Sequence, residues 1–418
     1  MKGHGPRPTR RCLIDAAAGL ATGLGVGAVA KAAGDAAPGG AVEPFWGEHQ
    51  GGITTPAQGH SYFAAFDLLT ARCSDLIRLL RAWTEAAARM ATGRPATPSG
   101  QNAAPDSGET LGMAPARLTV TFGFGAGVFV KDGKDRFGLA ARRPAGLVDL
   151  PRFNGDQLIP AKSGGDLSVQ ACADDPQVAF HAVRQLARLA SGAAAIRWVQ
   201  TGFVAGFPKH ETPRNLMGFK DGTGNLSAAD PWAMAKFVWI GDEGPAWLRG
   251  GSYVVARRIR IALEHWDRMP VAFQEAAIGR RKYSGAPLGG SDEFDRLDLA
   301  ATDRDGNPII PESAHVRLAA AATNGGAQIL RRVYSYNDGV DFTTERWPPW
   351  RQGIEYDAGL FFVCYQRDPR AGFIRIFDRL ARFDMLNQFV THTGGGLFAC
   401  PGGAREGEFI GQGLFEAV

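Results

Sequence analysis

The order of predicted strands and helices limits the possible folds most, because the chain runs through the same order twice. Alternating apolar residues indicate strands, and apolar residues at helical spacing indicate the helices between them. The first half has predicted strands at 60–66, 117–124, 166–173 and 195–205, and predicted helices at 69–87 and 176–191. The second half has predicted strands at 252–263, 327–336, 358–366 and 397–399, and predicted helices at 266–278 and 370–392. Each half therefore has the ferredoxin-like order, and we expect an α+β fold in which helices cover antiparallel sheets.

The first 40 residues differ from the rest of the chain. Arg10 and Arg11 precede a weakly apolar run at 16–30, which is typical of a twin-arginine export signal. A structureless basic tail is the alternative, and the run is too short and too rich in glycine to span a bilayer. Residues 1–30 carry four basic side chains and one acidic side chain, so the rest of the chain is nearly neutral. We expect an exported protein, periplasmic or extracellular, that has no membrane span and binds no nucleic acid.

A glycine-rich segment at 215–225 lies between the two halves and carries Asp221. Gly218, Gly222 and Gly224 permit positive φ angles and a close approach of the backbone to a flat ligand. A phosphate-binding loop is disfavoured, because no Lys-Ser/Thr pair follows the last glycine. The residues alone leave two interpretations open: a ligand-binding segment around Asp221, or a plain Asp-Gly turn.

The chain has eight histidines, and no two of them form a His-x-x-x-His or His-Glu-x-x-His pattern. This disfavours a zinc-protease site. His315 follows a turn-rich stretch at 303–311, in a segment that we predict to be irregular. A single histidine in this context suits a metal that needs one protein ligand, as haem iron does. A histidine without any functional role is the alternative.

Three segments together resemble those of the dye-decolourising peroxidases, and in particular the exported subgroup that includes the deferrochelatase/peroxidase of ferrous-iron uptake. They are Gly-Phe-Lys-Asp-Gly at 218–222, Pro-Glu-Ser-Ala-His-Val-Arg-Leu-Ala at 311–319, and Gln-Ile-Leu-Arg-Arg-Val-Tyr-Ser-Tyr at 328–336. Shorter matches extend the resemblance over about residues 43–418. It implies two ferredoxin-like domains, at 41–210 and 211–418, that form a dimeric α+β barrel-like structure and enclose one haem b. Residues 1–40 would be the signal segment and linker.

The resemblance also implies roles for single residues. His315 is expected to be the proximal ligand of the haem iron, with Asp221 and Arg331 as catalytic residues on the distal side. Further contacts to the haem are expected from Gly222, Thr223, Gly224 and Phe362. Arg332 is the alternative to Arg331, because alternation along a strand lets only one of the two face the haem. Val333 departs from the family pattern, in which glycine is common at this position.

A carboxylate is expected to accept a hydrogen bond from the second ring nitrogen of His315, since metal-bound histidines are usually oriented in this way. The position of Asp357 in the family pattern favours that residue, and Glu355 is the alternative.

The function implied by the resemblance is the oxidation of dyes, phenols or other small reductants by hydrogen peroxide. Asp221 would move a proton from the near to the far oxygen of the peroxide, and Arg331 would stabilise negative charge on the leaving oxygen. An unperturbed aspartate has a pKa of about 3.9, so acidic pH should favour activity. The alternative function is the release of iron from haem, as in a deferrochelatase. A homodimer and partners from an iron-uptake system are further expectations.

Overall fold

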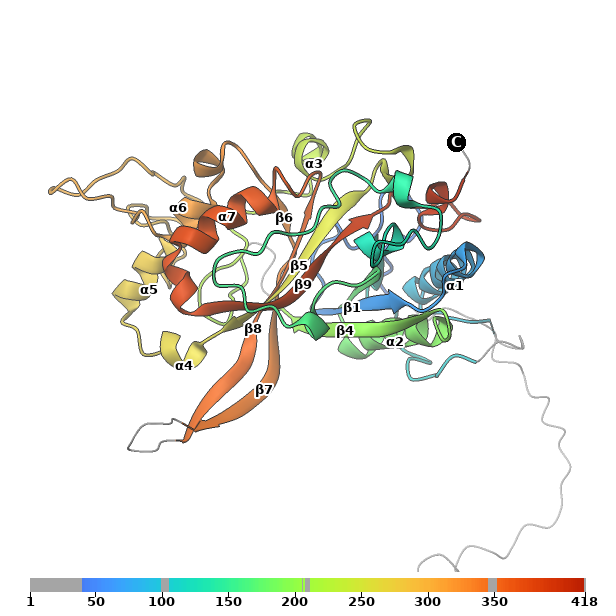
Figure 1. The fold of residues 1–418 in the computed structure, drawn as a ribbon. Helices are drawn as coiled ribbons and strands as arrows, with labels where there is room; N and C mark the ends of the chain where they lie inside the picture. The colour runs from blue at the N-terminus through green and yellow to red at the C-terminus, as the bar shows by residue number, and fades with distance from the viewer. Residues whose placement is uncertain (1–39, 99–104, 205, 207–210, 345–351, 417–418) are drawn as a thin grey trace, which may run out of the picture. The chain divides into compact units, whose positions relative to one another are not determined.

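A nine-stranded antiparallel sheet organises the protein in the computed structural model (Figure 1). The structure describes residues 40–98, 105–204, 206, 211–344 and 352–416, which all belong to one compact unit. The strands are β1 (His60–Leu68), β2 (Thr119–Phe124), β3 (Leu167–Ala173), β4 (Ala194–Phe203), β5 (Ser252–Ile261), β6 (Leu330–Arg331), β7 (Tyr334–Thr344), β8 (Gln352–Gln366) and β9 (Val390–Cys400). Their spatial order is β5-β9-β2-β3-β1-β4-β7-β8-β6. Because β5 also pairs with β8, the sheet closes into a barrel.

The two halves of the barrel have the same strand order. The first half runs β2-β3-β1-β4 and the second runs β7-β8-β5-β9, so the first and third strands of each half lie side by side at its centre. The halves meet where β2 pairs with β9 and β4 pairs with β7, each through a single residue pair. β6 and β7 act as one strand of the second half, because both keep the same register against β8. The predicted α+β fold with two ferredoxin-like halves is confirmed. The predicted signal segment, apart from Gly40, and the predicted domain boundary at residue 210 lie outside the described residues.

The helices are α1 (Cys73–Ala91), α2 (Pro176–Leu189), α3 (Pro231–Phe237), α4 (Leu263–Trp266), α5 (Val271–Ile278), α6 (His315–Ala319) and α7 (Phe373–Phe383). Figure 1 shows α1 and α2 beside the first half of the barrel, and α4 to α7 beside the second half. None of the helices in the described part of the chain is both long and apolar enough to cross a membrane.

Two predicted helices differ from the structure. The helix predicted at 266–278 is split into α4 and α5, because Pro270 has no backbone N–H for a continuous helix and instead precedes α5. The helix predicted at 370–392 ends at Phe383. Asp384 adopts an extended conformation there, and its carboxylate accepts the backbone N–H of Leu386 at 2.8 Å. The short helix α6, which begins at His315, was predicted to be irregular chain.

Alternation along the strands gives the barrel two apolar faces. Inside it, the ring of Phe63 on β1 packs against Phe361 on β8 and Phe398 on β9, so that the two halves share one core. On the outer face of the first half, Trp83 of α1 is buried against Phe66. Burying such an aromatic side chain contributes about 2–3 kcal/mol. On the outer face of the second half, Phe373 of α7 packs against Phe362 of β8.

Candidate active site

The segment at 213–225 forms a tight hairpin that presents Asp221. Asn215 shapes this hairpin, because its Oδ1 accepts the backbone N–H groups of Met217 at 3.0 Å and Phe219 at 3.4 Å. The N–H of Asp221 donates to the carbonyl of Pro213 at 2.8 Å. The carboxylate is therefore carried by backbone whose polar groups are already paired.

Two of the three glycines in this segment have backbone conformations that favour glycine. Gly218 has a φ angle of +84° and Gly222 a φ angle of +134°. Gly224 does not have a positive φ angle. Asp221 thus directly precedes a turn at Gly222 that a larger residue would strain, and it lies three residues after another at Gly218.

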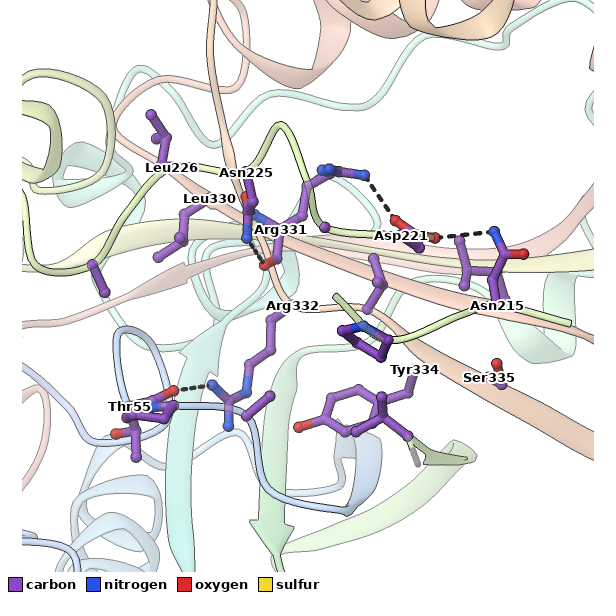
Figure 2. A pocket seen from close by; sticks show the side chains of 18 of the residues that line it. Thr55, Asn215, Asp221, Asn225, Leu226, Leu330, Arg331, Arg332, Tyr334 and Ser335 are labelled. Atoms are coloured by element: carbon purple, nitrogen blue, oxygen red, sulfur yellow. Dashed lines mark hydrogen bonds and ion pairs between the residues drawn. The ribbon is translucent and has the colours of Figure 1, made fainter. Parts of the chain in front are cut away.

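Asp221 and Arg331 form an ion pair at the wall of a cavity of about 260 Å³ (Figure 2). Nη1 of Arg331 lies 3.0 Å from Oδ1 of Asp221, and Nδ2 of Asn215 lies 3.3 Å from the other carboxylate oxygen. Asn225 holds the backbone of Arg331, since its Oδ1 accepts the N–H at 2.9 Å and its Nδ2 donates to the carbonyl at 2.7 Å. The cavity therefore has a carboxylate and a guanidinium fixed side by side.

Arg331 and Arg332 point to opposite sides of their strand. Figure 2 shows Arg331 directed towards Asp221 and Arg332 directed towards Thr55. The guanidinium of Arg332 is buried and donates to the carbonyl of Thr55 and to Oε1 of Gln58. Of the two candidates for the partner of Asp221, the structure selects Arg331.

His315 is the first residue of α6, and its ring is held by Asp384. Nδ1 of His315 lies 2.6 Å from Oδ2 of Asp384, which is almost fully buried. Burial lowers the pKa of His315, but the Asp384 carboxylate raises it by more, so the pKa lies above its ordinary value. The charge of Arg331 lowers the pKa of His315 and the charge of Asp221 raises it. Both residues are therefore near enough to His315 to affect its protonation.

The expected partner of His315 was therefore wrong. Asp357 forms an ion pair with Arg258 at 2.7 Å, and Glu355 lies 3.6 Å from Arg260. Both acids belong to the part of β8 that pairs with β7, and their charges are balanced by arginines of β5. Asp384 was missed because the sequence pattern placed it inside a helix, whereas it ends α7 and faces α6.

Phe362 lies on the outer face of β8, where its ring packs 6.0 Å from that of Phe373 on α7. Cys364 follows on the same face and is paired in register with Arg331. The half-buried ring of Phe362 is thus on the face of the sheet that also carries Arg331, and its expected contact with haem stays a prediction.

Thr223 forms a hydrogen bond with Glu293, which was not among the predicted site residues. Its hydroxyl donates to Oε1 of Glu293 at 2.8 Å, and the ammonium of Lys220 forms an ion pair with Oε2 of the same residue. Burial raises the pKa of Glu293, but hydrogen bonds from Lys220, Thr212 and Thr223 lower it by more, so the pKa lies below its ordinary value. Glu293 therefore fixes the segment on both sides of Asp221.

We expect Glu293→Gln to lower the free energy of unfolding by about 2 kcal/mol at neutral pH, because Lys220 loses a buried charged partner. A carboxylate with a depressed pKa stabilises the fold above its ordinary pKa, and this stabilisation is lost as the pH falls through the depressed value. Thermal unfolding of both proteins across this range should show the difference shrinking as the solution is acidified below about pH 4.5, the ordinary value. A difference that stays constant with pH would contradict this role of the charge.

Comparison with known proteins places these residues in a family. The family model for the N-terminal part of Dyp-type peroxidases matches residues 50–204, and the model for their C-terminal part matches residues 212–405. The chain belongs to the Dyp-type peroxidase family. The family predicted from the sequence motifs is confirmed, and with it the enzyme class, an oxidoreductase that uses peroxide.

Individual relatives match over most of their length. The chain is 41% identical to the dye-decolorizing peroxidase of Thermobifida fusca over 383 residues, which cover 88% of this chain and 84% of that protein. It is 38% identical to the deferrochelatase of Escherichia coli K12, with 89% of this chain and 87% of that protein covered. Ferric DtpA from Streptomyces lividans has the same fold with a TM-score of 0.81, at 42% identity over 90% of this chain and 98% of that one.

Proposed function

We propose that this peroxidase carries out its reaction at the ion pair of Asp221 and Arg331, with His315 as the third residue of the site. The observation that carries the proposal is the ion pair of Asp221 with Arg331 at 3.0 Å, held on both sides by Asn215 and Asn225. Such a pair supplies a proton acceptor and a permanent positive charge at one place, as the cleavage of an O–O bond requires.

The residues around His315 fit haem, the cofactor of this family. The side chain of His315 is 37% exposed, and Asp384 is bonded to its Nδ1. Nε2 has no hydrogen-bond partner among the described residues, so its lone pair is available to a metal. We propose that His315 would hold the iron of one haem b per chain, and that Phe362 and the backbone at Gly222, Thr223 and Gly224 would line its pocket.

Bound haem would supply the iron at which hydrogen peroxide binds and is reduced. In our proposal Asp221 accepts the proton of the inner peroxide oxygen and returns it to the outer oxygen, which leaves as water. The guanidinium of Arg331 stabilises the negative charge that develops on that oxygen. A carboxylate stays ionised at lower pH than an imidazole, which supports the expectation that acid favours activity.

The reductants in our proposal are dyes, phenols and other small organic molecules. Release of iron from haem is a second candidate function, because the relative from Escherichia coli at 38% identity is named a deferrochelatase. One experiment separates the two functions. The purified protein is incubated with haem, and protoporphyrin formation and peroxide-dependent dye oxidation are measured side by side. Dye oxidation without protoporphyrin supports the peroxidase alone, and protoporphyrin formation supports iron release.

Export by the twin-arginine route to the periplasm or the cell exterior is also part of the proposal. Arg10 and Arg11 before the weakly apolar run at 16–30 support it. Substitution of both arginines by lysine should retain the protein inside the cell, which fractionation would detect. A homodimer and partners in iron uptake stay predictions, for which the molecular mass in solution and co-purification are the tests.

A further inference from the structure

The cavity beside the ion pair of Asp221 and Arg331 extends well beyond these two side chains. Buried residues such as Ile53 and Leu330, at 2% and 5% exposure, form part of its inner wall. Ala57, which is exposed, lies at its outer end. The cavity therefore reaches from the surface of the protein to the carboxylate and the guanidinium of the site.

The volume of the cavity, about 260 Å³, limits what it can hold. Hydrogen peroxide has two oxygen atoms and occupies roughly twice the volume of a water molecule, or about 60 Å³. A cavity of about 150 Å³ in another protein holds a benzene molecule, whereas sites for drug-sized molecules have about 300–1,000 Å³. The cavity is thus much larger than peroxide needs, fits one substituted aromatic ring, and is too small for a dye with several rings.

The wall of the cavity is mostly apolar and has polar groups at few places. Its apolar residues include Ile53, Pro56, Val204, Leu226, Leu330 and Val333. Asp221 and Arg331 supply the charged groups, and the hydroxyl of Ser335 has no hydrogen-bond partner among the described residues (Figure 2). Peroxide is polar on every side and gains nothing from an apolar wall. A molecule with an apolar body and a hydroxyl group gains from both kinds of contact.

The cavity differs from the space that haem is expected to fill. Among the residues expected to contact haem, Gly222 belongs to the wall of the cavity, but His315 and Phe362 do not. The carboxylate of Asp221 accepts one hydrogen bond at each oxygen from its neighbours. Each of these oxygens has a second lone pair, so Asp221 can accept a further hydrogen bond without losing either contact. A small molecule in the cavity can therefore bind Asp221 while haem is present.

We propose that the cavity binds single-ring phenols, which serve as reductants of the peroxidase. The ring packs among the apolar side chains, and the phenolic hydroxyl donates a hydrogen bond to the carboxylate of Asp221. The hydroxyl of Ser335 binds a second polar substituent of the ring, such as a methoxy group. Dyes with several rings exceed the volume of the cavity and are oxidised outside it. This role rests on the proposed function, because the oxidant is the haem that peroxide has oxidised.

The oxidation of the phenols balances in atoms and electrons. Each phenol loses one electron to the oxidised haem, and its O–H bond breaks, so that the proton passes to the carboxylate of Asp221 and from there to the water that is formed. One hydrogen peroxide takes two electrons and two protons from two phenols and becomes two water molecules. Two phenoxyl radicals leave the cavity.

Two variants that add an aromatic ring to the wall test the proposal. Val333→Phe fills part of the cavity, and Ala57→Phe narrows its outer end. Each should raise KM for guaiacol, a single-ring methoxyphenol, by about tenfold or more. KM for an anthraquinone dye and the stopped-flow rate with hydrogen peroxide should stay unchanged, because the dye binds elsewhere and peroxide still fits. Ala195→Phe, at an exposed position of β4 outside the cavity, is the matched control and should behave like the parent protein.

Binding of guaiacol without peroxide separates this proposal from the proposed function, which is tested by the peroxide reaction of variants at Asp221. Equilibrium dialysis of the haem-loaded protein should give one guaiacol per chain, with a Kd about tenfold or more higher in both cavity variants. Ala57 is exposed, so Ala57→Phe gives a reading even if Val333→Phe does not fold. The proposal is overturned if the cavity variants change KM and Kd for guaiacol no more than Ala195→Phe does. It is also overturned if they slow the reaction with peroxide by the factor by which they raise KM, because the cavity would then only admit peroxide.

Discussion

Replacement of His315 by alanine is expected to remove most of the bound haem and to abolish the peroxide-dependent oxidation of dyes. The alanine has no group that could hold the haem iron in place of the imidazole Nε2, and Asp384 is left as a buried carboxylate without its partner at 2.6 Å. Loss of a group that only orients a metal ligand costs about 10–100-fold in affinity, so loss of the ligand itself should cost more. The ratio of haem absorbance to protein absorbance after purification measures the effect.

Two matched aspartate variants test whether haem binding depends on the imidazole of His315 and its partner Asp384. Asp384→Asn should weaken haem binding by about 10–100-fold, because a neutral amide holds the imidazole less firmly and makes it less basic. Asp357→Asn should leave haem content unchanged, since Asp357 is paired with Arg258. Full haem retention with an unaltered spectrum in His315→Ala would rule out this histidine as the ligand.

Replacement of Asp221 by asparagine is expected to slow the reaction of the haem-loaded protein with hydrogen peroxide by about 10²–10⁴-fold. Asparagine has nearly the same size as aspartate, so the hairpin and its contact with Asn215 should persist, but the amide cannot accept the proton of the peroxide. Haem content should stay normal. Stopped-flow absorption after mixing with peroxide gives the rate directly.

Arg331→Leu is the companion variant, and it should slow the same step while haem stays bound, because the positive charge at the leaving oxygen is lost. Asp174→Asn is the control, since this exposed carboxylate pairs with Arg117. Its rate should equal that of the parent protein. If Asp221→Asn and Arg331→Leu both react at the rate of the parent, the two residues do not have the roles that we propose.

The sequence was sufficient to predict the doubled ferredoxin-like order, because the periods of apolar residues reflect which face of each element is buried. It also pointed to Asp221 and His315, since each lies in a compact motif whose residues are neighbours along the chain. The pattern of apolar residues predicted the ends of helices less well, because some helices end at residues whose type does not indicate an end. The ends of α4 and α7 depend on Pro270 and on the capping carboxylate of Asp384, and only the first of these can be recognised from the residue type.

The tertiary structure decided the remaining features of the site. Because side chains alternate along a strand, the sequence predicts that Arg331 and Arg332 point to opposite faces of β6. Which of these faces carries Asp221 depends on the pairing of β6 with β8 and on the hairpin at 213–225. Asp384 lies 69 residues from His315 along the chain, and Glu293 lies 70 residues from Thr223. Hydrogen-bond partners so far apart leave no periodic trace in the sequence, because a carboxylate can pair with any donor that the fold brings within reach. The glycine motif and the histidine could therefore be identified from the sequence alone. The acids that support them, Asp384 and Glu293, could be identified only from the tertiary structure, which brings them next to their partners.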